Sequence, residues 1–271
     1  MKTIKRVVAT ILILITFIRV SAQEFKGIAI YKTSSKMTMT MDSTKMSGND
    51  QKELNAMIRK SMQKEYELRF NKNESLYKEI ESLKNDGDSQ GIEVIGLGSG
   101  TEGGIYKNSK TKSLVETRDL FGKLFLVKDS LANFNWKLED ETKRVGNYTC
   151  HKAVSVKKRI KKVTVLDENG KEKEEEKEFI TTLTAWYTPQ IPVSTGPASY
   201  WGLPGLILEM DNGRLSMICS KIILNPQKEV VIKEPTKGKV VSSEEFDSRF
   251  MEKVNEMKEM YSDKRKKKKN E

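Results

Sequence analysis

Ser199-Tyr200-Trp201-Gly202-Leu203-Pro204-Gly205-Leu206-Ile207-Leu208-Glu209-Met210 joins a turn to a short apolar run. Pro204-Gly205 favours the turn, because proline presets φ at the first central position and glycine supplies a positive φ at the second. The run from Leu206 to Met210 is too short for a typical helix, and Asp211-Asn212-Gly213 closes it. This pattern predicts a buried strand that enters a hairpin.

Apolar side chains surround this turn, although turns are normally polar. An apolar turn packs against its own core, a ligand or a partner. Other aromatic residues join it in a candidate ligand or partner surface. That surface consists of Trp186, Tyr187, Tyr200, Trp201, Leu203, Pro204 and Leu206. The alternative interpretation is that these rings fill the core.

The six residues from Gly202 to Ile207 read GLPGLI. On this motif the chain resembles the GLPGLI family, a group of secreted proteins of unknown function from Bacteroidetes-type bacteria. Other segments of the chain resemble the family as well. They are Gly27–Tyr31, Asn135–Leu138, Thr142–Val145, Gly146–Ala153 and Ala185–Thr188. The resemblance implies a secreted protein and no particular reaction.

The first 22 residues have the pattern of a secretory signal peptide. A basic start is followed by an apolar stretch from Val7 to Ile18 and by the small residues Val20-Ser21-Ala22. We expect cleavage near Ala22 and a mature chain in the periplasm or outside the cell. No cysteine lies directly after this point, so we expect no lipoprotein anchor, and an uncleaved anchor is the alternative.

The formal net charge is +11, and part of it comes from the run Lys264–Lys269. A secreted chain rarely meets nucleic acid, so we expect attraction to anionic lipid or polysaccharide surfaces and no nucleic-acid partner. We predict a single β-rich domain over residues 23–262 and a basic, disordered tail over residues 263–271.

Short strand-like runs dominate the mature chain, and their short connections predict an antiparallel meander. We expect them near residues 25–32, 66–70, 75–77, 105–107, 113–119, 123–128, 136–139, 146–158, 179–188, 205–210 and 215–223, with an edge strand at 230–232. The predicted fold class is α+β, mainly antiparallel: a curved sheet or half-barrel with a helix near residues 50–63 and a C-terminal helix near residues 243–262.

The C-terminal helix has a start signal and one apolar face. Ser242-Ser243-Glu244-Glu245 fits a capping box. The apolar residues at helical spacing are Phe246, Phe250, Val254, Met257 and Tyr261. We expect the helix to pack on the sheet, and a helix that lies on a membrane is the alternative. Between two strands, Asn169-Gly170 and the charge run 171–178 predict a solvated hairpin extension.

Catalytic patterns are weak in this sequence. The only histidine, His151, follows Cys150, and neighbouring strand residues point to opposite faces, so the two form no dyad. A pair of carboxylates remains open as an acid–base site. We expect a non-enzymatic protein without a cofactor. An oxidising compartment permits a disulfide between Cys150 and Cys219, and two separate buried thiols are the alternative.

Met37, Met39 and Met41 alternate with threonines. The pattern predicts a strand face, and Cu(I) binding by thioethers is the sharper alternative. Our first hypothesis is a periplasmic binding protein that holds an apolar ligand or an outer-membrane partner near the GLPGLI motif. A structural or protein-interaction role at the cell envelope is the second, and methionine-based metal handling is the third.

Overall fold

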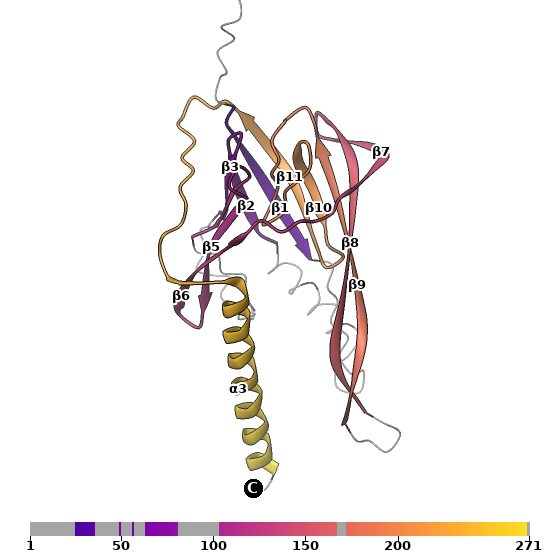
Figure 1. Cartoon of the computed structure of the whole chain (residues 1–271), viewed down its shortest axis with the longest axis vertical. Helices are drawn as coiled ribbons and strands as arrows, with labels where there is room; N and C mark the ends of the chain where they lie inside the picture. Colours follow the sequence, from indigo (N-terminus) through magenta and orange to yellow (C-terminus); the bar gives the residue numbers. More distant parts are fainter. Residues whose placement is uncertain are drawn as a thin grey trace, which may run out of the picture.

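The computed structural model describes residues 25–35, 63–80, 103–166 and 172–269, together with Asn49 and Ala56. These residues form an open, curved sheet of twelve strands and a C-terminal helix (Figure 1). All neighbouring strands pair antiparallel except β12 and β6, which are parallel. The predicted α+β, mainly antiparallel fold with a curved sheet is therefore confirmed.

The predicted strands from residue 105 to residue 224 are all present, with shifted ends. The elements are β1 (Gly27–Ser35), β2 (Glu65–Phe70), β3 (Glu74–Glu79), β4 (Ile105–Asn108), β5 (Ser113–Leu120), β6 (Lys123–Ser130), β7 (Lys137–Val145), β8 (Tyr148–Leu166), β9 (Glu172–Thr188), β10 (Leu206–Asp211), β11 (Leu215–Leu224), β12 (Lys239–Val241) and α3 (Ser243–Lys269).

Two meanders make up the sheet, and the first strand joins them. The strand order is β12-β6-β5-β4-β3-β2-β1-β11-β10-β9-β8-β7. Strand β1 therefore pairs with β2 of the first meander and with β11 of the second. Burial alternates along β1, because one face of the sheet packs on the core. Ala29 and Tyr31 are fully buried, while Lys32, the residue after Tyr31, is exposed.

Two irregular segments cross the sheet because the meanders are joined through β1. The crossover, residues 131–136, leads from β6 to the far edge strand β7, and its Leu131 and Phe134 are buried. The strap, residues 225–238, leads from β11 back to β12. Its Ile232 packs on a cluster formed by Tyr106, Val115 and Leu126.

The predicted edge strand at residues 230–232 is wrong. These residues belong to the strap and make no strand, and the edge strand forms later, at β12. Gly238 permits this pairing, because a Cβ there would lie 2.8 Å from the backbone nitrogen of Leu126 in β6. The run Val230-Val231-Ile232 is apolar and β-branched, as in a strand. The strap carries it over one face of the sheet, so its backbone has no neighbouring strand to pair with.

Helix α3 begins as predicted and extends further. The Ser242 hydroxyl accepts a hydrogen bond from the backbone N–H of Glu245 at 3.1 Å, which is one half of a capping box. Phe246 is buried against Phe125, with ring centroids 5.6 Å apart. The helix continues to Lys269, so the run Lys264–Lys269 lies on its last turns. The division into one domain over residues 23–262 and a disordered tail stays a prediction.

The helix expected near residues 50–63 lies outside the described residues, apart from Ala56 and Gln63, as does the Met37–Met41 segment. The signal peptide, residues 1–22, lies outside them too. Among the described helices, none is both long enough and apolar enough to cross a bilayer.

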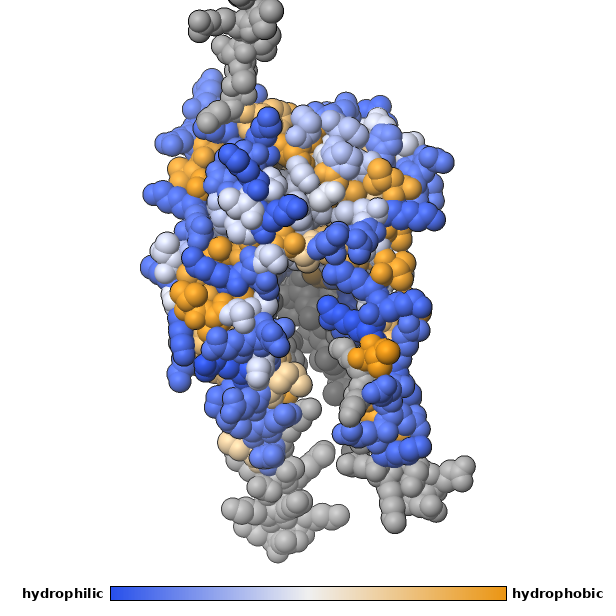
Figure 2. Space-filling view, viewed as in Figure 1, coloured by the Kyte–Doolittle hydropathy of each residue, from blue (hydrophilic) through white to orange (hydrophobic). Residues whose placement is uncertain are grey.

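The β8–β9 hairpin extends well beyond the rest of the sheet (Figure 1). Strand β7 pairs with β8 only as far as Val154, and β10 pairs with β9 only from Thr184. Residues 155–166 and 172–183, which we call the arm, therefore pair only with each other among the described strands. Figure 2 shows that the arm and α3 are mostly hydrophilic. The predicted solvated hairpin extension is confirmed.

Candidate functional site

The GLPGLI motif ends a long loop between β9 and β10, residues 189–205, which we call the motif loop. The loop folds back on the strand that follows it. The backbone N–H groups of Leu206 and Ile207 donate to the carbonyls of Ile191 and Thr195, each at 3.0 Å. From β1, the buried Tyr31 hydroxyl donates to the Ile207 carbonyl at 2.6 Å. The loop is thus part of the packed structure.

The two glycines of the motif serve different purposes, and one differs from the prediction. We expected Gly205 to supply a positive φ, but Gly202 does so, with φ of +94°. Gly205 is needed for close packing, because a Cβ there would lie 2.2 Å from the Thr188 carbonyl oxygen. Only glycine permits such an approach between two backbones without displacing one of them.

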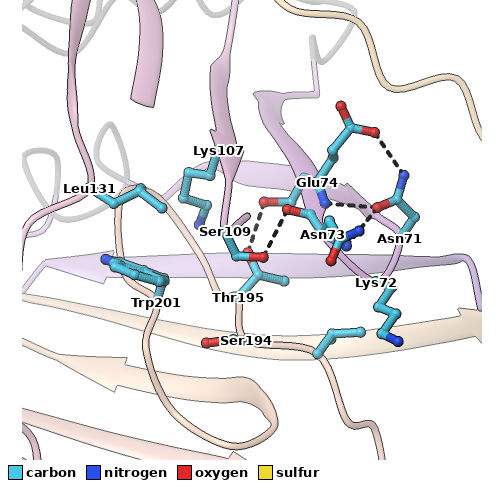
Figure 3. A pocket seen from close by; sticks show the side chains of 12 residues that line it. Asn71, Lys72, Asn73, Glu74, Lys107, Ser109, Leu131, Ser194, Thr195 and Trp201 are labelled. Atoms are coloured by element: carbon cyan, nitrogen blue, oxygen red, sulfur yellow. Dashed lines mark hydrogen bonds between the residues drawn. The ribbon is translucent and has the colours of Figure 1, made fainter. Parts of the chain in front are cut away.

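A buried lysine from the neighbouring meander holds the motif loop from inside (Figure 3). Lys107 lies in β4, and its Nζ donates to the carbonyls of Gly196, Ala198 and Tyr200 at 2.6, 2.7 and 3.0 Å. An ammonium group has three N–H donors, and all three are used here. Because a hydrogen bond to a charged group is worth about 1.5–3 kcal/mol, this contact fixes the loop firmly.

Burial lowers the pKa of Lys107 to about 7, because the charged ammonium loses its hydration. The three carbonyl dipoles act in the opposite direction, since they stabilise the charged form. No nitrogen lone pair is available while the ammonium donates all three bonds. While it is protonated, Lys107 is therefore a structural cation whose three N–H donors are all in use.

Two tryptophans tie the motif loop to the crossover. The Trp201 indole N–H donates to the Ala132 carbonyl, and the Trp136 indole N–H donates to the Trp201 carbonyl, both at 2.8 Å. Phe134 stacks on Trp136 and lies at a tilt against Tyr200, with ring centroids 5.3 Å apart in both pairs. These contacts explain the two aromatic residues of the crossover, since Phe134 and Trp136 both pack against the cluster that contains the motif loop.

The structure divides the seven predicted surface residues into three groups. Tyr187, Leu203 and Leu206 are buried, with at most 5% of their surface exposed, so they belong to the core. Trp186 is half-buried beside Lys143, whose Nζ lies 4.3 Å from the ring centroid and 2.6 Å from Glu209 Oε2.

The remaining three are the half-buried Tyr200 and Trp201 and the exposed Pro204, and the half-buried Trp136 donates its indole N–H to the Trp201 carbonyl. We call these four residues the GLPGLI surface. Sequence reasoning did not include Trp136, although the family resemblance covered it. It also missed Lys107, because a lysine in a short strand carries no sequence signal for burial.

The space beside Trp201 is small and polar. It is lined by the β2–β3 turn, by Ser109, and by Ser194 and Thr195 of the motif loop (Figure 3). Its volume of about 10 Å³ is close to the minimum for one water molecule. Small-molecule sites are usually about 300–1,000 Å³. Among the described residues, this hollow is therefore too small for an apolar ligand.

Cys150 is buried in the core, and Cys219 and the single histidine, His151, are half-buried at its edge. Both cysteines are free thiols, which is the second of the two arrangements that the sequence left open. Burial raises the pKa of Cys150 to about 11 and that of Cys219 to about 12, which suppresses the reactive thiolate. His151 packs on Tyr187 in a different cluster from Cys150, as strand alternation predicted.

A metal site is equally unsupported in this part of the chain. Within the described ranges, no three His, Cys, Asp or Glu side chains are placed to hold a metal ion. Met37, Met39 and Met41 lie outside the described residues, so their proposed thioether site stays a prediction.

A family model described as a protein of unknown function (Porph_ging) matches residues 136–209. The match begins at Trp136, includes the whole motif loop and ends two residues after the GLPGLI motif. It covers less than half of the chain, and the resemblance of Gly27–Tyr31 to a family strand stays a prediction. A comparison with curated proteins finds no match.

Among solved structures, the chain is similar to two structures of PNGF-II, in space groups C2 and P21. The sequences are 14% and 15% identical, and the TM-score is 0.46 in both cases. Each alignment covers 84% of this chain and 33% of the PNGF-II chain, so this chain spans about a third of the length of that protein.

Proposed function

We propose that this chain is a non-enzymatic binding protein of the bacterial envelope, and that a protein partner docks on the GLPGLI surface. The supporting observation is that the surface is held in place from two sides. Lys107 fixes the motif loop from inside, and the indole N–H groups of Trp136 and Trp201 fix it on the crossover. A rigid aromatic surface loses little entropy on binding, and Trp and Tyr are enriched among energetically important interface residues.

A protein partner suits this site better than an apolar small molecule. The side chains that would line an apolar pocket, Leu203 and Leu206, are buried in the core. The hollow beside Trp201 holds about one water. Of the two occupants in our first hypothesis, we therefore keep the outer-membrane protein. Pro204, an exposed residue of the motif, would lie at the centre of that contact.

A non-enzymatic role is supported by the chemistry of the described groups. The thiols of Cys150 and Cys219 have raised pKa values, and the Lys107 amine is occupied by three carbonyls. The periplasmic location is part of the proposal and follows from the signal-peptide pattern of residues 1–22. It requires a mature protein that begins at Gln23, which N-terminal sequencing would check.

Photo-crosslinking in the native bacterium tests the partner surface. A photoreactive side chain at Pro204 should give one defined protein adduct, and the same group at Lys123, an exposed residue of β6, should not. In the Pro204 background, Trp201→Ala should reduce the adduct while circular dichroism shows a folded chain. If the adduct pattern is the same at both positions, or if Trp201→Ala unfolds the chain, the aromatic cluster is core only.

A second candidate is a structural role at the envelope, which the arm and the basic end of α3 favour. Both project from the same end of the sheet (Figure 1), and Lys264–Lys269 lie on the last turns of α3. Clustered lysines bind anionic headgroups at about 1 kcal/mol each near the surface. Deletion of residues 264–271 should weaken sedimentation with anionic vesicles at low salt, and unchanged sedimentation would exclude the tail as an anchor.

A further inference from the structure

A cleft lies on the face of the sheet opposite the motif loop. It is formed by the outward side chains of β2 and β3 and by the strap that crosses them. The register pairs Glu67 with Lys78 and Arg69 with Leu76, so these four side chains share one face. Their sequence neighbours Leu68, Phe70 and Tyr77 are buried in the core on the other face. The cleft is therefore separate from the GLPGLI surface.

The strap forms a lasting wall of this cleft because it is held on both sides of Val231. Val230 is buried, and Ile232 packs on the Tyr106 cluster. Two residues further, Glu234 forms an ion pair with Lys128 at 3.1 Å. Val231 and Lys233, which lie between these contacts, line the cleft. The volume of about 310 Å³ is at the lower end of the range for small-molecule sites.

The charges of the cleft are unbalanced. Glu67 is paired with Arg69, with 2.5 Å between Oε1 and Nε. The other two cations, Lys78 and Lys233, have no ion-pair or hydrogen-bond partner among the described residues. The apolar part of the lining comes from Leu76 and Val231. A site with two unpaired ammonium groups beside an apolar wall complements a molecule with an anionic head and a short apolar chain.

We propose that this cleft binds a single-chain amphiphile with an anionic head. Lys78 and Lys233 contact the head, and Leu76 and Val231 contact the chain. A carboxylate head and a phosphate head satisfy the same two cations, so a fatty acid and a lysophospholipid are alternative sources of the ligand. The inference is independent of the proposed partner surface, because the two sites lie on opposite faces of the sheet.

Titration of the mature protein with dodecanoate, dodecyl phosphate and dodecanol, each below its micelle concentration, tests the proposal. Calorimetry should show saturable binding of one or both anions, and the tighter one identifies the head group. The double variant Lys78→Gln/Lys233→Gln should weaken the binding by about tenfold. Each substitution removes the Coulomb attraction between one solvent-exposed ammonium group and the anionic head. Dodecanol binding should be weak and should not change.

A matched control separates this site from the general positive charge. Lys110→Gln/Lys123→Gln removes two exposed lysines that do not line the cleft and should leave the affinity unchanged. Val231→Glu, at a partly exposed position, should abolish binding in a folded protein. Non-saturable uptake of the anions, or an equal loss in the control pair, would overturn the proposal. Failure here leaves the crosslink at Pro204 unaffected, so the two proposals fail separately.

Discussion

The motif loop and the arm are both continuous with β9, yet they are stabilised in opposite ways. The motif loop has almost no regular structure, but it is held by Lys107, by Tyr31 and by two indole N–H groups. The arm is entirely regular, with a continuous register from Ser155 to Leu166, and its apolar Ile160 and Ile180 are 70% and 59% exposed. Regular hydrogen bonding therefore does not identify the more stable part of this molecule.

The difference between the motif loop and the arm depends on how far away in the sequence the partners of each segment lie. Lys107 is about 90 residues from the carbonyls that it binds, whereas the strands of the arm pair only with each other. A two-stranded hairpin without a third strand or a packed face is marginal in water. We therefore expect stability to concentrate at the motif loop and to fall along the arm, and the following predictions test this difference.

The largest effect is expected for Gly205→Ala. Its new Cβ would lie 2.2 Å from the Thr188 carbonyl oxygen and 2.5 Å from the carbonyl carbon, so the backbone of β9 must move. We expect a loss of about 4 kcal/mol in the free energy of unfolding, which urea denaturation measures. Gly202→Ala is the control. Its Cβ meets nothing closer than 3.7 Å, and only its positive φ costs about 1–2 kcal/mol. Equal losses would show that the close approach is unimportant.

Lys107→Met should cost about 3 kcal/mol, because it leaves one buried and two partly buried carbonyls without this donor. The matched variant in the arm is Lys158→Met, which removes an exposed ion pair with Glu178. Exposed pairs contribute little, so we expect a change below about 0.5 kcal/mol there. The comparison between loop and arm fails if the two lysines cost the same.

Stability should also depend on pH through Lys107. Burial lowers its pKa to about 7, while the unfolded chain keeps the ordinary value of 10.5. Between these values the unfolded state binds the extra proton, so stability rises with pH, by up to about 1.4 kcal/mol per unit. Urea denaturation at pH 7 and pH 9 should show the wild type gaining relative to Lys107→Met. An unchanged difference would mean that the three carbonyls offset the desolvation.

The smallest effect is expected in the arm. Ile180→Ala removes a side chain that is more than half exposed, so the free energy of unfolding should change by less than about 0.5 kcal/mol. The same substitution at the fully buried Ile207, in the motif, should cost about 2–5 kcal/mol. A large loss for Ile180→Ala would show that the arm is covered in solution by another surface.

Much of the fold could be predicted from local patterns. Alternation of apolar and polar residues located the strands of both meanders, and the capping box located the start of α3. The strap shows the limit of this reasoning, because Val230-Val231-Ile232 has the composition of a strand but no neighbouring strand to pair with. The β1 strand shows another, since nothing local in Gly27–Ser35 places it between two meanders.

The candidate site was predicted less completely than the fold. The aromatic residues around GLPGLI do gather near the motif, but Tyr187, Leu203 and Leu206 face the core, and Trp136 and Phe134 arrive from the crossover. The sequence shows which residues are apolar, but it does not show which of them are buried in the core and which lie at the surface.

Local sequence was sufficient for the strands of the two meanders and for the cap of α3, because these depend on residues within a few positions of one another. Only the tertiary structure decided that Lys107 holds the motif loop, that the two cysteines remain separate, and that Lys78 and Lys233 face one cleft. These features depend on burial and on partners many residues apart, and the free energy of a buried charge or a close backbone contact is set by neighbours that local sequence does not specify.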